Sequence, residues 1–321
     1  MVQICRRAFV QKAGLAAAGA ALLGRGTAAP AHAQVGRRMT MALSPGAIGV
    51  RATQIEAIEL AAKYGFESVD AFSAYLASLD EAQLADLLGL MKTKGVTFGA
   101  AGLPVDFRKD ETAFAGGMKE LPRIAAGLRR AGVTRMTTWI MPCHDTLTYA
   151  KNFRQHATRL REVGRVLGDH GIRLGLEYVG PKTLWTSKRY PFLHTLGEAL
   201  DLIQETGAAN IGVLLDSYHW WTAGDTEADI LALRAEQVVS LDLNDGAAGV
   251  PREEQIDGKR ELPCATGAID LAIFLNAVHK IGFDGPARAE PFNKALNDLE
   301  NDAACAATAE AMKKAFALIR A

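Results

Sequence analysis

The chain has 321 residues, of which 49% are hydrophobic and 22% are charged, and these values exclude a disordered or fibrous chain. Lysine and arginine together number 36, as do aspartate and glutamate, so no basic excess argues for binding to nucleic acid. The four cysteines show no C-x-x-C spacing, so the sequence predicts neither a disulfide framework nor a zinc knuckle.

The first 33 residues have the composition of an export signal. Arg6-Arg7 and Lys12 precede the apolar run "LAAAGAALLG", and residues 31–33 form an A-x-A ending. The run has about ten residues, whereas a membrane-spanning helix needs ~20. The arginine pair resembles a twin-arginine signal, which directs the export of folded proteins. We therefore expect a signal peptide over 1–33 and a periplasmic or secreted mature chain, 34–321. The alternative is a chance arginine pair ahead of an uncleaved anchor.

The mature chain alternates short apolar runs with longer stretches of helical period. Eight runs have the length and composition of buried strands: 39–43, 66–71, 96–100, 135–141, 172–178, 211–216, 238–243 and 286–290. A helical stretch follows each of them. In 149–170, for example, apolar residues recur at three- and four-residue steps from Phe153 to Leu167, and Gly171 then ends the helix. Eight such units without a linker predict an α/β fold, a closed (β/α)8 TIM barrel in a single domain.

An open, doubly wound sheet is the alternative fold. Such sheets often carry a glycine-rich phosphate-binding turn after the first strand. Here the first strand is followed by "SPGAIGV", which does not match G-x-G-x-x-G. The eight similar units therefore favour the closed barrel.

Acidic residues stand at the ends of the last four predicted strands. They are Glu177 in "GLEYVGPK", Asp216 in "LLDSYHWW", Asp242 in "SLDLNDG" and Glu290 in "ARAEPFN". In a TIM barrel the carboxyl ends of the strands carry the chemistry, so these four side chains should converge at one mouth. Four carboxylates would repel one another without a cation, and hard oxygen ligands suit a divalent ion such as Mg²⁺ or Mn²⁺. A helix cap or a salt bridge explains any one of them alone.

The sequence resembles the xylose isomerase-like TIM barrel group, the sugar phosphate isomerase/epimerase family, over about residues 38–320. The likeness is strongest in "LGLEYVGPKTLW", in "NIGVLLDSYHWW" and in the long segment from "PREEQIDGKRELP" to "DGPARAEPF". The family places a Glu, an Asp, usually a His and a Glu on strands five to eight around one divalent metal. The resemblance implies that Glu177, Asp216 and Glu290 are metal ligands.

The chain departs from the family at its third ligand position. The family segment there reads H-x-x-D or H-x-N-D, whereas this chain has Asp242-Leu243-Asn244-Asp245. A metal site of Glu177, Asp216, Asp242 and Glu290 would have a net charge of −2 with a divalent ion bound, which favours Mn²⁺ or Mg²⁺ over zinc. Direct binding by Asp242 and a water-bridged contact both remain open.

The resemblance also implies a mechanism. The metal grips two adjacent oxygens of a keto-sugar or keto-acid, and Glu177 and Glu290 move a proton on the carbon between them through an enediolate intermediate. Return of the proton to the same carbon gives epimerisation, and return to the next carbon gives isomerisation. Loss of a β-leaving group gives elimination instead. The ligand set does not distinguish these outcomes.

Six further residues are candidates for substrate binding. They are His219, Lys182, Arg260, Trp185, Asn244 and His144, all at or after predicted strand ends. His219 matches a family position that faces the substrate, and Arg260 matches a recurring basic position in the loop before the last helix and strand that could hold a carboxylate or hydroxyls. Lys182 could equally be a solvated loop residue. Tryptophans at a barrel mouth stack on sugar rings, although core packing explains one or two of them equally well. Three other histidines, His156, His170 and His279, fall in predicted helices and are expected at the surface.

The sequence therefore predicts a divalent-metal-dependent isomerase or epimerase of a sugar or keto-sugar. Alternatives are a metal-dependent lyase or dehydratase of 3-keto-glycosides or cyclic keto-acids, and a non-catalytic carbohydrate-binding barrel. Apurinic endonucleases share the barrel, but they use a His-rich, multi-zinc site and a basic face. After removal of 1–33 this chain has 32 basic and 36 acidic residues, so no nucleic-acid partner is expected. No membrane span is expected in the mature chain, and assembly into a homo-oligomer is left open.

Overall fold

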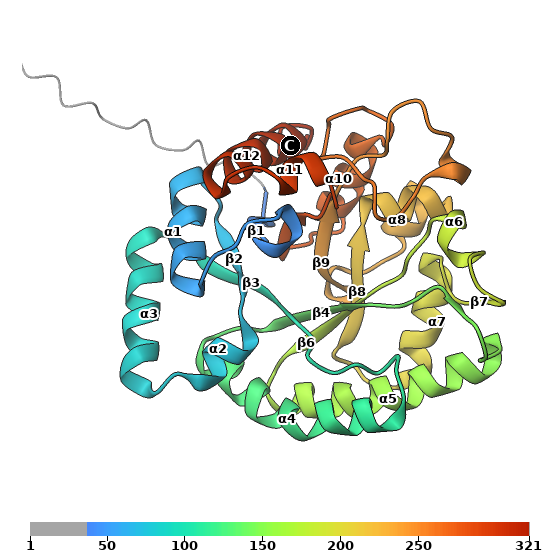
Figure 1. The fold of residues 1–321 in the computed structure, drawn as a ribbon, viewed down its shortest axis with the longest axis horizontal. Helices are drawn as coiled ribbons and strands as arrows, with labels where there is room; N and C mark the ends of the chain where they lie inside the picture. The colour runs from blue at the N-terminus through green and yellow to red at the C-terminus, as the bar shows by residue number, and fades with distance from the viewer. Residues whose placement is uncertain (1–36, 321) are drawn as a thin grey trace, which may run out of the picture. The chain divides into compact units, whose positions relative to one another are not determined.

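The computed structural model describes residues 37–320, and they form a closed parallel barrel surrounded by helices (Figure 1). The barrel strands lie in the order β1-β10-β9-β8-β6-β4-β3-β2. Their bounds are β1 (Thr40–Leu43), β2 (Ser68–Ala71), β3 (Thr97–Gly102), β4 (Arg135–Trp139), β6 (Arg173–Glu177), β8 (Ile211–Asp216), β9 (Val238–Leu243) and β10 (Pro286–Ala289). The eight predicted strands and the predicted closure are confirmed, and the open sheet is excluded.

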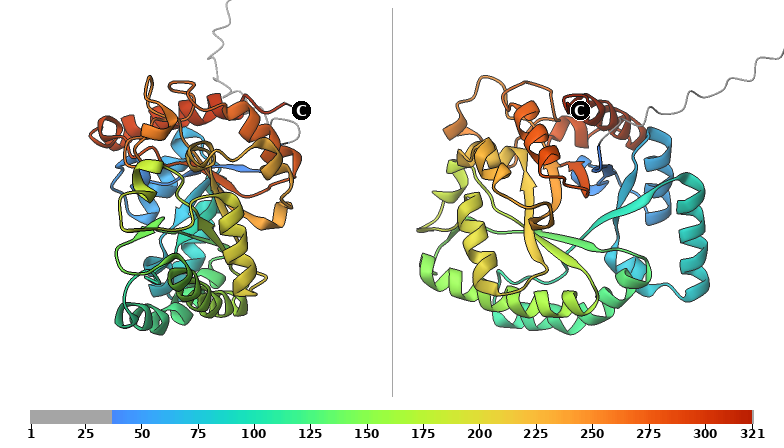
Figure 2. Two further views of the ribbon diagram at one scale, coloured as in Figure 1. Left: turned by 90° about the vertical axis from the view of Figure 1, so that its right-hand side faces the viewer. Right: turned by 180° about the vertical axis from the view of Figure 1, so that it is seen from behind.

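Helices form the outer layer, as the two further views in Figure 2 also show. They are α1 (Gln54–Tyr64), α2 (Ser73–Ser78), α3 (Glu81–Lys94), α4 (Glu111–Arg130), α5 (Tyr149–Asp169), α6 (Lys182–Trp185), α7 (Leu196–Thr206), α8 (Ser217–Ala223), α9 (Glu227–Leu231), α10 (Leu271–Lys280), α11 (Lys294–Asn297) and α12 (Asn301–Phe316). A short antiparallel pair, β5 (Cys143–His144) and β7 (Tyr190–Pro191), lies outside the barrel sheet. Helix α12 packs beside α1, so the end of the described chain lies next to its beginning.

Local sequence signals set the helix boundaries. Helix α1 begins with a capping box in which Thr53 and Glu56 satisfy each other's backbone amides, and it ends at Gly65 in the left-handed conformation. Helix α5 ends one residue before the predicted limit, and Gly171 follows it with a φ of 69°. The predicted apolar face of α5 is buried from Ala157 to Leu167. Helix boundaries therefore follow from capping chemistry, and helix orientation follows from the apolar stripe.

One predicted surface position is wrong. His156 is only 3% exposed, because its ring lies between Phe107 and Phe192 with centroid distances of 5.3 and 5.0 Å. His170 and His279 are partly exposed. The proposed signal peptide, residues 1–33, lies outside the described residues. Within 37–320 no helix combines the length and apolarity that crossing a membrane requires.

Candidate functional site

Four carboxylates meet at the carboxyl ends of neighbouring strands. Glu177 ends β6, Asp216 ends β8, Asp242 lies in β9 and Glu290 directly follows β10. Each can offer an oxygen so that the four oxygens all lie within 4.8 Å of one another. Strand order explains this convergence, because β6, β8, β9 and β10 are consecutive neighbours in the barrel. The pairing of Asp216 with Asp242 across β8 and β9 places those two side by side.

Asp242 is fully buried and is paired with a residue that the sequence did not single out, Arg288. The Nε and Nη2 atoms of Arg288 donate to the two Asp242 oxygens at 2.8 and 2.9 Å, a two-pronged ion pair. The register of the sheet causes it, because Arg288 on β10 is the direct partner of Asp242 on β9. Arg288 also donates to Glu290 at 3.2 Å and to Asp70 at 3.2 Å. Both oxygens of Asp242 are therefore occupied by a guanidinium group.

Asp216 is held by a second arginine and an amide. Arg260 Nη1 donates to Asp216 Oδ2 at 2.8 Å, and Asn244 Nδ2 lies 3.1 Å from both Asp216 oxygens. Asn244 Oδ1 accepts from the Glu290 backbone N–H at 2.9 Å, so this one amide fixes two of the four carboxylate-bearing positions. Arg260 Nη2 also donates to Asp257 at 2.7 Å. Hydrogen bonds within the protein therefore hold Asp216 and the backbone of Glu290 in place before any ligand enters.

Glu177 differs from the other carboxylates because one of its oxygens is unused. Glu177 Oε1 is buried and has no hydrogen-bond partner among the described residues. The nearest cationic candidate is His219 Nε2 at 3.6 Å, but that nitrogen lies 3.0 Å from Arg260 Nη2, which donates to it. Burial lowers the pKa of His219 well below its ordinary value, and the positive charge of Arg260 lowers it further, so His219 is neutral. An unpaired buried carboxylate oxygen is costly, and it requires a partner from outside the protein.

The electrostatics of the cluster disfavour full ionisation without a cation. Burial, with the charges of Glu290, Asp242 and Asp216, raises the pKa of Glu177 well above its ordinary value. Burial likewise raises the pKa of Glu290 and of Asp216 to about 7, against the opposing effect of the two arginines. An added positive charge would therefore bring all of these carboxylates into their ionised form.

The donor set fits the divalent ion that the resemblance implies. Glu177, Asp216, Asp242 and Glu290 carry four negative charges when ionised, and Arg260 and Arg288 return two positive charges. Over these six residues the net charge is −2, and Asp257 and Asp70, which also pair with the two arginines, add further negative charge, so a cation would be favoured beside the unpaired Glu177 Oε1. Glu177 has an unpaired oxygen, whereas Asp216 and Asp242 already accept hydrogen bonds at both oxygens, Asp216 from Asn244 and Arg260 and Asp242 from Arg288. A carboxylate oxygen that accepts one hydrogen bond keeps a second lone pair, so the four carboxylates together form a donor set that suits a hard cation.

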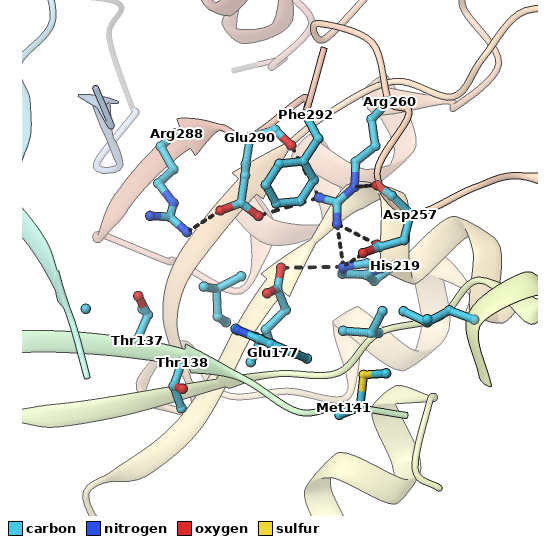
Figure 3. Close-up of a pocket in the computed structure, with 15 residues that line it drawn as sticks. Thr137, Thr138, Met141, Glu177, His219, Asp257, Arg260, Arg288, Glu290 and Phe292 are labelled. Atoms are coloured by element: carbon cyan, nitrogen blue, oxygen red, sulfur yellow. Dashed lines mark hydrogen bonds and ion pairs between the residues drawn. The ribbon is translucent and has the colours of Figure 1, made fainter. Parts of the chain in front are cut away.

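A cavity of about 410 Å³ is lined by Glu177 and Glu290, whereas the fully buried Asp216 and Asp242 do not line it. Figure 3 shows Glu177, Glu290, Arg288 and Arg260 facing it, with Phe292 at its rim. Phe292 has a φ of 44°, an unusual conformation for a non-glycine residue, and its ring is 40% exposed with the Arg260 guanidinium 4.6 Å from its centroid. An apolar ring above a charged floor suits a small ligand with one polar and one apolar face.

The predicted substrate-binding residues divide into three groups. His219 and Arg260 line the central cavity, whereas His144 lines a neighbouring one. Asn244 is fully buried behind Asp216 and Glu290, so it positions carboxylates and has no open face for a substrate.

Lys182 and Trp185 do not line the central cavity. Lys182 is exposed on α6, and Trp185 stacks on His194 with the ring centroids 4.6 Å apart. Both residues lie on the short helix α6 that follows Glu177, and neither side chain lines the central cavity. Their position soon after a strand end was therefore not sufficient to place them in the site. Of the tryptophans, Trp139 reaches the cavity from the end of β4.

Sequence reasoning missed Arg288 and Asp257. The place of Arg288 could have been predicted from the sequence, because it precedes Glu290 by two residues and successive side chains of a strand alternate between faces, so residues two apart share a face. Asp257 lies in the loop after β9 and had no periodic signal.

Comparison with known proteins places this chain in a family. The sequence pattern of the xylose isomerase-like TIM barrel matches residues 58–319. An inosose isomerase from Bacillus velezensis is 23% identical over 241 residues, which cover 73% of this chain and 82% of that protein. A 3-dehydroshikimate dehydratase from Pseudomonas aeruginosa is 28% identical over 139 residues, 43% of this chain and 20% of that protein. The structure of a xylose isomerase domain protein from Alicyclobacillus acidocaldarius superposes with a TM-score of 0.77 at 31% identity, over 87% of this chain and 99% of that one. The chain belongs to the xylose isomerase-like TIM barrel family.

Proposed function

We propose that this protein is a divalent-metal-dependent isomerase or epimerase of a sugar or keto-sugar, which moves a proton on the carbon next to a carbonyl group. The observation that carries the proposal is the convergence of Glu177 and Glu290 on one cavity floor, with Glu177 Oε1 buried and unpaired. Relatives that isomerise inososes or dehydrate 3-dehydroshikimate support the same class of chemistry.

Glu177 and Glu290 have the placement of a base and an acid. They come from β6 and β10, which are separated in the barrel by β8 and β9, so they approach a bound ligand from different directions. One carboxylate takes the proton from the carbon and the other returns it, which requires each to lie within hydrogen-bond reach of the ligand. Arg288 and Arg260, which face the same cavity, hold the ligand's oxygens and Glu290 in place.

Glu177, Asp216, Asp242 and Glu290 would hold the metal ion, Mn²⁺ or Mg²⁺ by the hardness of the donors. The bound ion would supply a positive charge that stabilises the negative charge developing on the carbonyl oxygen as the proton leaves. The protein's own contribution is the fixed geometry around it, because Asn244 and Arg260 keep Asp216 from rotating.

Proton exchange with solvent tests the proposal. The Mn²⁺-loaded protein is incubated in D₂O with ketoses, 3-keto-glycosides and dehydroshikimate, and deuterium on the carbon next to the carbonyl is measured by NMR. We expect incorporation into at least one compound, abolished in Glu177→Gln and retained in Glu205→Gln, an exposed control on α7. Absence of exchange with every compound would favour a non-catalytic carbohydrate-binding barrel.

A lyase or dehydratase is the second candidate, and the dehydratase relative favours it. Both reactions begin with the same proton abstraction, so they differ only in the fate of the intermediate. Product analysis by mass spectrometry separates them, because elimination changes the mass of the product and isomerisation does not.

We also propose that the enzyme is exported, on the support of Arg6-Arg7 and the apolar run that follows. A fusion of residues 1–40 to a reporter that fluoresces only after folded export should give a fluorescent periplasm. Replacement of Arg6-Arg7 by two lysines should abolish the signal, whereas Arg25→Lys should not. Export of the lysine variant would contradict the twin-arginine assignment.

A further inference from the structure

A second cavity, of about 460 Å³, lies beside the central one. The two share Trp139 and Met141 in their linings. The second cavity is lined by the loop after β3, the segment from the end of β4 to β5, the N-terminal part of α5, and Lys188 between α6 and β7. The central cavity alone is already within the range of about 300–1,000 Å³ of small-molecule sites. A single sugar ring over the carboxylates therefore leaves the second cavity unfilled.

Two residues that line this second cavity, His156 and Asn152, each carry a buried hydrogen-bond acceptor without a partner among the described residues. His156 Nδ1 lies 3.0 Å from the Asn152 carbonyl oxygen, so it carries the ring proton and leaves Nε2 as a bare acceptor. Burial lowers the pKa of His156 to about 4, which keeps the ring neutral. His156 Nε2 and Asn152 Oδ1 are both buried, and neither has a hydrogen-bond partner within residues 37–320. His156 and Asn152 are 3% and 2% exposed, so both atoms depend on a donor that enters the cavity.

The bare acceptors, more than the charges of the cavity wall, indicate what the cavity binds. Lys109 and Arg108 both pair with Asp106, at 3.0 and 3.4 Å, and Lys188 pairs with Asp145 at 2.9 Å. These three basic side chains face two carboxylates, which leaves one positive charge, but an anion brings no proton to the two bare acceptors. A hydroxylated ligand brings O–H donors.

The shared wall between the cavities is aromatic. The Trp139 side chain is 43% exposed and lies in both linings. The Arg108 guanidinium lies 4.4 Å from the centroid of the Trp139 ring system and donates to the Trp139 carbonyl oxygen at 2.6 Å, so the side chain is held in place. A fixed indole between two cavities suits a ligand of two sugar units, since sugar rings pack against aromatic surfaces.

We infer that the second cavity is a subsite for a second sugar unit, and that the substrate is a disaccharide or glycoside whose keto-sugar unit lies over Glu177 and Glu290. The hydroxyl groups of the second unit donate to His156 Nε2 and Asn152 Oδ1, and Trp139 contacts both units. This inference rests on the proposed function, because that function places the reacting unit in the central cavity.

Binding measurements test the inference separately from turnover. Dissociation constants of D-fructose and of three ketose disaccharides (lactulose, turanose and isomaltulose) are measured by calorimetry on the Mn²⁺-loaded protein. We expect at least one disaccharide to bind at least tenfold more tightly than fructose. Failure of the proposed function would appear as absent deuterium exchange, whereas failure of this inference would appear as equal affinities. The two outcomes are therefore distinguishable.

Variants of the two acceptors complete the test. His156→Phe and Asn152→Leu replace each polar side chain by an apolar one of similar size and so remove the acceptors. Each variant should reduce the disaccharide-to-fructose affinity ratio at least fivefold. His279→Phe, on α10 and outside both linings, is the matched control and should keep the wild-type ratio. Thermal melting checks that each variant is folded. Equal affinities for fructose and every disaccharide in the wild type would show that the acceptors bind water only and would overturn the inference. An unchanged ratio in both folded acceptor variants would overturn it as well.

Discussion

Removal of Arg288 tests the electrostatic account of the site most directly. Arg288→Met leaves Asp242 fully buried with neither oxygen paired, because both of its present hydrogen bonds come from Arg288. Breaking a buried pair by removing one partner costs about 3–5 kcal/mol, mainly through the charge left behind. Glu290 and Asp70 lose a contact as well. We expect the free energy of unfolding of the metal-free protein, measured with urea after EDTA treatment, to fall by about that amount.

A second variant separates the lost pair from a general loss of packing. Arg288→Met combined with Asp242→Leu removes both charges and keeps the volume, and such replacements are often neutral in stability. We therefore expect the double variant to recover most of the loss. Arg165→Met, which removes an exposed arginine from a 3.9 Å surface pair, serves as the control and should change stability by less than about 1 kcal/mol. A cost below about 1 kcal/mol for Arg288→Met, or a double variant no more stable than the single one, would refute the reasoning.

Three further predictions concern Arg288, Asp242 and His156. Arg288→Met should tighten Mn²⁺ binding at least tenfold by calorimetry, because the cluster then carries −3 instead of −2; unchanged affinity would contradict the charge count. Asp242→His alone should lower the melting temperature, because Arg288 loses its two-oxygen partner, and adding Arg288→Met should restore it. His156 has a pKa of about 4 in the folded protein and an ordinary value of 6.5, so its contribution to stability is complete above pH 6.5 and is lost as the pH falls toward 4. That loss amounts to about 2 kcal/mol between pH 7 and pH 5, and His156→Phe should remove it from urea titrations at the two pH values.

The barrel could be predicted from the sequence because its signals are local. Strands buried on both faces read as continuous apolar runs, and each helix after them carries its own cap or glycine stop. The candidate carboxylates could be predicted for a related reason. An acid such as Asp216 at the end of an apolar run is unusual by itself, and the closed barrel brings all such strand ends to one mouth.

The partners within the site could not be predicted in the same way. Arg288 and Asp242 are neighbours only through the register of β10 against β9, which periodicity does not fix. The burial of His156 depends on Phe107 and Phe192, two loop residues far from it in sequence that cover this part of α5. Asn244 was expected to contact substrate because it follows a strand end, but its side chain turns back between Asp216 and the backbone of Glu290. Each of these depends on long-range packing, which leaves no local pattern.

The departure from the family at position 242 now has a physical explanation. A neutral histidine there, with Glu177, Asp216 and Glu290 ionised and Arg260 present, would leave the cluster at −2. Asp242 adds one negative charge and Arg288 adds one positive charge beside it, so the cluster of this chain is also at −2. Over these residues, the Asp242–Arg288 pair therefore gives the same net charge as a neutral histidine would give. Because Arg288 also donates to Glu290, it provides a fixed cation next to one of the two carboxylates that we propose move the proton, which a histidine ligand would not provide. The positive charge of Arg288 would stabilise negative charge that develops on a substrate near Glu290 during the reaction. The metal ion would then need to supply less of that stabilisation.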